Sequence, residues 1–182
     1  MLKLLFLVCI TLGANLVSAT DFWTEVQSTR SRGAAWNQVN AGLSGGGETL
    51  GYYALGQSLS TGYRQIYAGP KVNPTDWLEA GVALGVEETS ASAWTRRAGY
   101  VWLGRDKISL LGVYENGGTG PWHKLVLNYK VTTDLSVGIQ NQSFFGTGPR
   151  AEYAFNKHLS LWGVVLKNET STTTMMAVKF KF

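Results

Sequence analysis

The final nine residues, Thr174-Met-Met-Ala-Val-Lys-Phe-Lys-Phe182, alternate apolar side chains with small or cationic ones as far as the last residue. The apolar set is Met176, Val178, Phe180 and Phe182, and the other set is Ala177, Lys179 and Lys181. Because successive side chains of a strand point to opposite faces, this pattern predicts a β-strand with one apolar face and two ammonium groups on the other. The chain is therefore predicted to end on an amphipathic strand.

Residues 1–19 have the pattern of a secretory signal peptide. Lys3 supplies the positive start, residues 4–12 form the apolar run, and small residues precede a cleavage site before Thr20. Asn15 interrupts the run well short of the about 20 residues that a membrane-spanning helix needs. We therefore expect a cleaved leader rather than a membrane anchor.

A terminal phenylalanine strand behind a secretory signal resembles the closing strand of bacterial outer-membrane β-barrels. The resemblance covers the architecture of the whole mature chain, rests on generic features and identifies no subfamily. In that family the barrel assembly machinery reads the terminal aromatic strand, which implies that Phe180 and Phe182 are the assembly signal. The implied location is the outer membrane of a Gram-negative-type cell envelope, and the implied partners are outer-membrane lipids and the assembly machinery.

The composition excludes several other classes. Cys9 is the only cysteine and lies in the leader, so the mature chain cannot form a disulfide. The net charge of +4 is too small and scattered to indicate nucleic-acid binding, although it suits anionic lipid headgroups. The 7 Trp and 8 Tyr residues suit interfacial girdles. We expect no cofactor, and two separated histidines make no metal cluster.

From Tyr63 onward, segments of about ten residues alternate in polarity, which is the length that a tilted strand needs to cross the hydrocarbon. The predicted strands are 63–72, 77–87, 93–103, 108–115, 122–131, 135–143, 150–155, 159–167 and 174–182. With Phe182 on the periplasmic side, the turns at 73–76, 104–107, 132–134 and 156–158 are periplasmic. The loops near 88–92, 116–121, 144–149 and 168–172 are then external, an alternation expected of a bacterial barrel.

The N-terminal part of the pattern leaves the number of strands open. Residues 34–43 and 50–59 are predicted strands, which gives eleven, whereas single-chain bacterial barrels have an even number. Residues 22–30 either supply a twelfth strand or form a short amphipathic helix on the inner face. We predict an all-β, closed antiparallel transmembrane barrel over residues 20–182 with about twelve strands, with ten or eight as alternatives and residues 20–33 unassigned. A soluble periplasmic sandwich is the competing fold, but its open sheets would carry exposed edges.

Polar residues on the parity opposite the apolar faces are predicted to line the lumen. They are Glu79, Lys124, Asn128, Gln140, Arg150, Glu152 and Lys179. They can line a water-filled passage, or they can pair with one another and fill the interior, because ten to twelve strands lie between filled eight-stranded barrels and wide channels. Buried charges must pair, and Arg150 with Glu152 offers such a pair.

The candidate chemistry is sparse. His158, Ser160 and Glu169 are residue types of a nucleophilic site, and they resemble the His-x-Ser pair and glutamate of outer-membrane lipid A deacylases. However, Leu161 stands where that pattern has asparagine, and the predicted register places His158 at a periplasmic turn. We read residues 156–160 as a hairpin and leave catalytic residues unassigned.

The sequence therefore predicts a structural barrel or a small-solute channel. A loop-mediated adhesin or receptor and a lipid A-modifying enzyme are the alternatives, and an enzyme is the less favoured class. His123, beside Trp122, is expected to anchor the wall at the membrane interface. The sequence does not indicate an oligomeric state.

Overall fold

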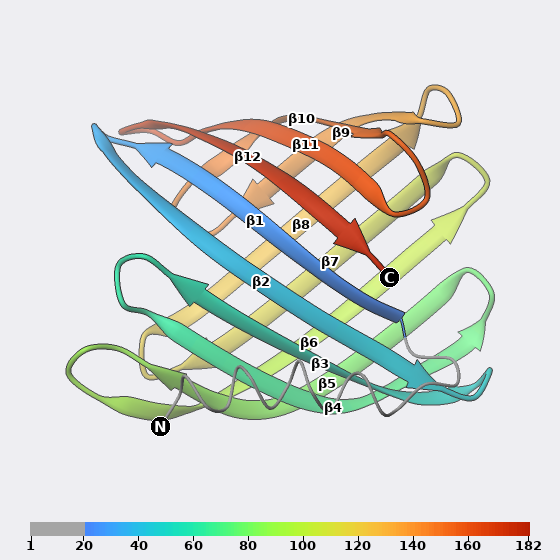
Figure 1. The fold of residues 1–182 in the computed structure, drawn as a ribbon, viewed down its shortest axis with the longest axis horizontal. Coiled ribbons are helices and arrows are strands. Elements are labelled where there is room, and N and C mark those ends of the chain that lie inside the picture. Colours follow the sequence, from blue (N-terminus) through green and yellow to red (C-terminus); the bar gives the residue numbers. More distant parts are fainter. Residues whose placement is uncertain (1–20) are drawn as a thin grey trace.

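A computed structural model describes residues 21–182, and in this range twelve antiparallel strands form one closed barrel (Figure 1). The strands are β1 (Asp21–Ser31), β2 (Ala34–Gly46), β3 (Leu50–Leu59), β4 (Arg64–Thr75), β5 (Leu78–Glu88), β6 (Ala93–Arg105), β7 (Ile108–Gly117), β8 (Gly120–Lys130), β9 (Leu135–Gln142), β10 (Gly146–Ala154), β11 (Leu159–Lys167) and β12 (Thr172–Lys181). The predicted leader (residues 1–19, including Cys9) and Thr20 lie outside the described residues. In residues 21–182 no helix is long and apolar enough to cross a membrane.

The barrel closes between its first and last strands. β1 pairs antiparallel with β12, from Trp23 opposite Lys181 to Ser31 opposite Thr173. Beyond the ladder, the Phe182 amide donates to the Phe22 carbonyl oxygen at 2.9 Å, and the two rings lie 5.6 Å apart. Twelve strands and a closed ladder confirm the predicted fold class. The segment 21–31 is a strand, so the alternative of an inner amphipathic helix is wrong.

The outer wall is apolar because one parity of each strand faces away from the barrel. On β5 the side chains of Val82 and Leu84 are 64% and 65% exposed, and on β9 Ile139 is 54% exposed. Their inward neighbours Ala83 and Gln140 are buried. A continuous exposed belt of this kind would be a liability in water, but it matches a hydrocarbon solvent.

The hairpins at one rim are shorter than the sequence predicts. The predicted loop 116–121 is wrong, because Asn116 pairs with Pro121 and Gly117 pairs with Gly120, leaving only two residues between β7 and β8. The predicted loop 144–149 is wrong in the same way, since residues 146–149 belong to β10.

The glycines there permit close approach rather than a long loop. A Cβ on Gly117 would lie 2.5 Å from Oε1 of Glu87, and one on Gly118 would collide with the Trp94 indole ring. Glycine is also used where another group must come near the backbone. The sequence analysis interpreted these glycines only as signs of a loop.

The outward parity generates a depth-dependent prediction. Leu84→Arg places a guanidinium near the middle of the outer wall and should lower the free energy of unfolding by about 2–4 kcal/mol. Ile108→Arg is the matched control, because Ile108 begins β7 at a rim and is 57% exposed; its cost should be about 0–1 kcal/mol. Urea titration of tryptophan fluorescence in lipid vesicles measures both. Equal costs at the two depths would contradict the assigned orientation.

Candidate functional site in the barrel lumen

Contacts between strands that are not neighbours identify the inward face. The Trp162 indole of β11 donates to Oε2 of Glu25 on β1 at 2.7 Å, and the Tyr67 hydroxyl of β4 donates to Oε1 of Glu115 on β7 at 3.0 Å. The strands in each pair are separated by at least one other strand in the ladder. Such contacts reach across the interior, so these side chains fill part of the lumen.

A buried ion cluster lies inside β5, β6 and β7, and we call it the Arg96 cluster. The Arg96 guanidinium lies between Glu87 and Glu115, with Nε 2.9 Å and Nη2 2.8 Å from Oε2 of Glu115 and with Nη1 on Oε2 of Glu87. All three residues are less than 5% exposed. Two carboxylates against one guanidinium leave this cluster with an excess of negative charge.

Neutral donors complete the solvation of the two carboxylates. Glu87 accepts from the Tyr63 hydroxyl at 2.9 Å and from the Thr119 amide at 2.8 Å, and Glu115 accepts from Tyr67 and from Gln65. Burial raises the pKa of the Tyr63 phenol, and its hydrogen bond to Glu87 raises that pKa further, so this group remains a donor. Buried charges are tolerated only when paired and hydrogen-bonded in this way.

A second group, the Trp162 cluster, lies inside β10, β11 and β1. The Arg150 guanidinium carbon lies 4.1 Å from the centroid of the Trp162 ring. Arg150 also donates to Oε2 of Glu152 at 3.0 Å and to Oε1 of Gln140 at 3.2 Å. The indole is thus held by a cation over its face and by Glu25 at its N–H.

Two lysines in this part of the lumen form no close ion pair with a carboxylate. Lys124 Nζ lies 5.3 Å from the centroid of the Trp162 ring, and Lys179 Nζ lies 4.6 Å from that of Trp23. Among residues 21–182, neither ammonium forms an ion pair within 4.0 Å. Three cations, counting Arg150, face two carboxylates here, so this side of the lumen carries an excess of positive charge.

The remaining predicted lumen residues lie on the same inward parity. Glu79 accepts from Lys71 Nζ at 2.8 Å and from the Tyr100 hydroxyl at 2.6 Å. Asn128 is half-buried on β8, opposite Ser109 and Gly138 in the ladder. The predicted set is therefore divided. Arg150, Glu152, Gln140 and Lys124 meet at the Trp162 cluster, Lys179 lies over Trp23, Glu79 belongs to a separate ion pair, and Asn128 joins none of these.

The lumen is filled on one side and more accessible on the other. Most inward residues of β11 and β12 are buried, namely Ser160, Trp162, Val164, Leu166, Thr173, Met175 and Ala177. The inward residues Gln38 and Ser44 of β2, and Tyr53 and Gln57 of β3, are only half-buried. The inward side chains of β2 and β3 are therefore less completely buried than those of β11 and β12.

An aromatic pair lies inside the barrel near one rim. Phe145, in the turn between β9 and β10, packs on the apolar residues of β11 and β12, and its ring centroid lies 6.0 Å from that of Trp36 on β2. Trp36 lies close to the β1–β2 hairpin, which is at the external rim in the predicted orientation. The pair thus connects β2 to the β9–β10 turn across the intervening strands.

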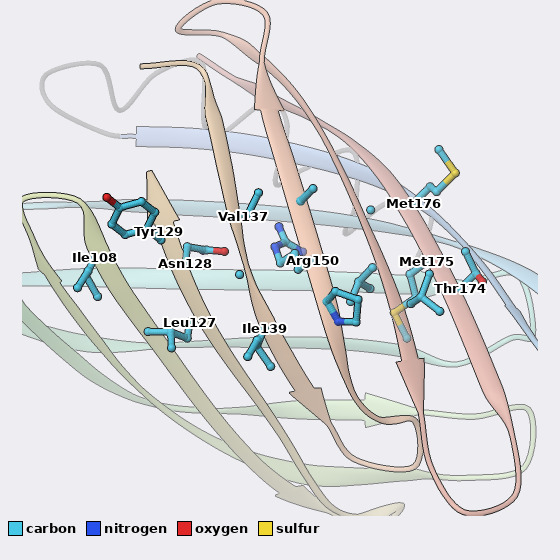
Figure 2. Close-up of a pocket in the computed structure, with 16 residues that line it drawn as sticks. Ile108, Leu127, Asn128, Tyr129, Val137, Ile139, Arg150, Thr174, Met175 and Met176 are labelled. Atoms are coloured by element: carbon cyan, nitrogen blue, oxygen red, sulfur yellow. The ribbon is translucent and has the colours of Figure 1, made fainter. Parts of the chain in front are cut away.

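The outer wall carries shallow apolar grooves. The larger, of about 870 Å³, lies over β7 to β12, and Leu127, Ile139 and Met176 are among the residues that line it (Figure 2). Its lining also includes the small residues Ala151 and Gly163. A second groove of about 640 Å³ lies over β4 to β8. Most of the side chains that line them have outward parity, so both grooves open toward the surrounding lipid.

The structure does not assemble the hydrolase-like set. Ser160 donates to Oε1 of Glu152 at 3.1 Å inside the barrel, whereas the Nδ1 of His158 lies 2.9 Å from the Lys181 carbonyl oxygen at the rim. Glu169 lies in the β11–β12 loop, at the opposite end of β11 from His158. In the described part of the chain no cluster of histidine, cysteine or carboxylate side chains could hold a metal ion.

Sequence reasoning missed the Arg96 cluster. Arg96 and Glu115 were placed in strands, but no apolar stripe beside them identified their parity. For Glu87 the alternation of the sequence was informative, because Glu87 has the same parity as the predicted lumen residue Glu79 on β5. Trp162 was missed because β11 has apolar residues on both parities, so that the pattern does not show which face a tryptophan occupies.

Comparisons with known proteins support the fold. No protein-family model matches the sequence, and no curated protein matches it significantly. Among solved structures it is similar to the KdgM porin, at TM-score 0.65 and 10% identity over 88% of this chain and 99% of that one. It is also similar to the NanC porin, at TM-score 0.60 and 9% identity over 87% of this chain and 100% of that one. A third similar structure is Omp33 of Acinetobacter baumannii, at TM-score 0.56 and 12% identity over 90% of this chain and 99% of that one. The chain has the fold of bacterial outer-membrane β-barrels, as the terminal strand predicted, and no subfamily is identified.

The Arg96 cluster generates a stability prediction. Arg96→Ala leaves two carboxylates buried without a cation and should lower the free energy of unfolding by about 3–5 kcal/mol. Arg105→Ala is the matched control, because the Arg105–Asp106 pair is almost fully exposed at 4.0 Å and should contribute nothing measurable. Urea unfolding of the refolded barrels measures both, and an unaffected Arg96→Ala protein would show that the cluster is not buried as described.

Proposed function

We propose that this protein is an integral outer-membrane barrel whose lumen forms a narrow passage for small solutes and favours anions. The observation that carries the proposal is the excess of positive charge around the lumen lysines Lys124 and Lys179, neither of which forms an ion pair within 4.0 Å. A lumen that served only as a filled structural core would be expected to neutralise each buried cation, because an unpaired buried charge is costly. In an open passage, water solvates these ammonium groups and a passing solute anion supplies the counter-charge.

The wall and the fold support this assignment. The exposed apolar parity suits a hydrocarbon environment, and the closed ladder satisfies the strand backbones without water. The fold is shared with the KdgM and NanC porins. A KdgM structure contains oligogalacturonate, an anionic saccharide, so a barrel of this architecture accommodates an anion. We infer the same broad class of cargo here from charge, and we assign no particular solute.

The transverse arrangement of charge has a physical consequence for a solute. The Arg96 cluster has an excess of negative charge on one wall, and the Trp162 cluster has an excess of positive charge on another. Fixed charges lining a pore set which ions enter and how strongly they are held. An anion is expected to pass beside Lys124 of β8 and Lys179 of β12, on the side of the lumen with excess positive charge.

The loop-mediated alternatives have less support. The connections at the predicted external rim are short, the β7–β8 turn having only two residues between strands, which leaves little surface for an adhesin or receptor. The predicted partners remain outer-membrane lipids along the wall and the barrel assembly machinery at the terminal strand. Phe180 and Phe182 are accessible to such a partner, at 41% and 72% exposed.

Ion selectivity tests the proposal. Lys124→Gln with Lys179→Gln should move the reversal potential in a KCl gradient toward cation preference, because both substitutions remove lumen charge without adding bulk. Lys107→Gln is the control, since this lysine is exposed in the β6–β7 turn. Planar-bilayer recordings on heat-modifiable, refolded protein give the measurement. Absence of conductance from folded wild-type barrel would overturn the channel assignment.

The Trp36–Phe145 pair gives a second, independent test. Phe145→Ala should raise the single-channel conductance without changing ion preference, because it removes one side of the Trp36–Phe145 constriction and no charge. Phe155→Ala provides the comparison, since Phe155 is 57% exposed and packs on Tyr153 of the outward parity. An unchanged conductance in Phe145→Ala would place the narrowest point elsewhere.

A further inference from the structure

A hydrogen-bonded serine, histidine and asparagine lie together on the outer wall. The Ser143 Oγ lies 2.8 Å from Nδ1 of His123, and the His123 Nε2 lies 2.8 Å from Oδ1 of Asn141. His123 is on β8, Asn141 on β9, and Ser143 directly follows β9. All three have the outward parity, whereas the intervening Lys124 and Gln142 have the inward one. This group is therefore separate from the lumen site.

Neighbouring hydrogen bonds fix the roles of the three side chains. Asn141 Nδ2 donates to the Thr147 hydroxyl at 2.6 Å, which leaves Oδ1 to face the imidazole and accept the Nε2 proton. In that tautomer Nδ1 of His123 is unprotonated and accepts from the Ser143 hydroxyl. The arrangement is a hydroxyl nucleophile, a base and a group that orients the base.

The serine is also held in place by the backbone. The Ser143 amide donates to the His123 carbonyl oxygen at 3.0 Å, and the His123 amide donates to Ser143 Oγ at 2.8 Å. These bonds fix the hydroxyl beside the imidazole before any substrate arrives. Preorganisation of this kind is what catalysis by a side-chain pair requires.

An apolar groove begins at the same histidine. The 640 Å³ groove on the outer wall is lined by His123 together with Leu125, Tyr114 and Val101, and the small residues Gly99 and Gly112 form its floor. Its walls are outward and lipid-facing, and His123 lies three residues from the start of β8, near the external rim. An acyl chain in this groove would place its ester, at the interface, beside the Ser143 and His123 pair.

We propose that Ser143, His123 and Asn141 form a catalytic site that cleaves carboxylic esters of long-chain membrane lipids. The site requires no lumen passage and goes beyond the proposed channel function. It also differs from the His158, Ser160 and Glu169 set, whose members the structure keeps apart.

The reaction balances with water as the only co-substrate. Ser143 Oγ attacks the ester carbonyl carbon while His123 Nδ1 takes the hydroxyl proton, and the imidazolium then gives that proton to the departing alcohol oxygen. This leaves an acyl ester on Ser143. Water attacks that ester with His123 again as the base, which releases the fatty acid and restores the serine. Asn141 acts as a positioning residue, since it holds the imidazole and does not touch the substrate.

Covalent labelling and lipid hydrolysis test the site together. Refolded full-length barrel in vesicles of phosphatidylethanolamine and phosphatidylglycerol is treated with a long-chain alkyl fluorophosphonate, and the labelled peptide is identified by mass spectrometry. In parallel, release of free fatty acid from the same vesicles is measured. The variants are Ser143→Ala, His123→Gln and Asn141→Ala, with Ser160→Ala as the matched control inside the lumen.

The expected result is a label on Ser143 and fatty-acid release that Ser143→Ala abolishes. His123→Gln should reduce release by about 10²-fold or more, the range for loss of a general base. Asn141→Ala should slow both labelling and release and leave the apparent affinity for lipid unchanged. Ser160→Ala should behave as wild type, and heat-modifiability on unboiled gels verifies that each variant is folded.

The outcomes separate this site from the channel. Ser143→Ala should keep wild-type conductance, because Ser143 lies on the outer wall. Folded wild-type protein that neither takes the label at Ser143 nor releases fatty acid overturns the proposal and leaves the three residues as a capped end of the β8–β9 ladder. Activity that persists in Ser143→Ala, or a label on another serine, overturns it as well.

Discussion

Every backbone amide and carbonyl in the hydrocarbon must find a partner within the protein, because lipid offers none. This requirement makes the pairing of β1 with β12 the contact on which the rest of the barrel depends. Without it, two edges would carry unpaired groups into lipid, and the inward and outward parities would lose their meaning. The hydrogen bond from the Phe182 amide to the Phe22 carbonyl oxygen extends the closure to residue 182.

Closure then creates an interior that must accommodate charge. The interior does so by solvating carboxylates with several donors each, as at Glu87 and Glu115, and by stacking cations on aromatic rings, as at Trp162. The two arrangements are not equivalent. The first surrounds its ions with donors. The second leaves Lys124 and Lys179 without a close ion pair, so this side of the lumen keeps an excess of positive charge.

Polar groups on the outer wall also require partners within the protein. Outward side chains are apolar over most of the wall, so a polar group among them requires its own partners. His123, Asn141, Ser143 and Thr147 provide these for one another at the end of the β8–β9 ladder. The mutual satisfaction that makes the four residues tolerable at the lipid interface also aligns a hydroxyl with an imidazole.

Local features of the sequence were sufficient to predict the barrel fold and the parity of its strands. A period of two, segments long enough to cross the hydrocarbon and the terminal Phe182 are local properties, and they sufficed to place Glu79, Arg150 and Glu152 on the inward parity. Local reading failed at residues 116–121, where glycine makes room for the Glu87 carboxylate instead of opening a loop.

The contacts between side chains inside the barrel could be identified only from the three-dimensional structure. Trp162 and Glu25 are 137 residues apart, and Gln65 reaches Glu115 across two intervening strands. Such partners depend on the stagger between strands and on the curvature that closure imposes, and neither is encoded in the alternation of a single strand. Parity gives the face on which a side chain lies, and closure gives its partner.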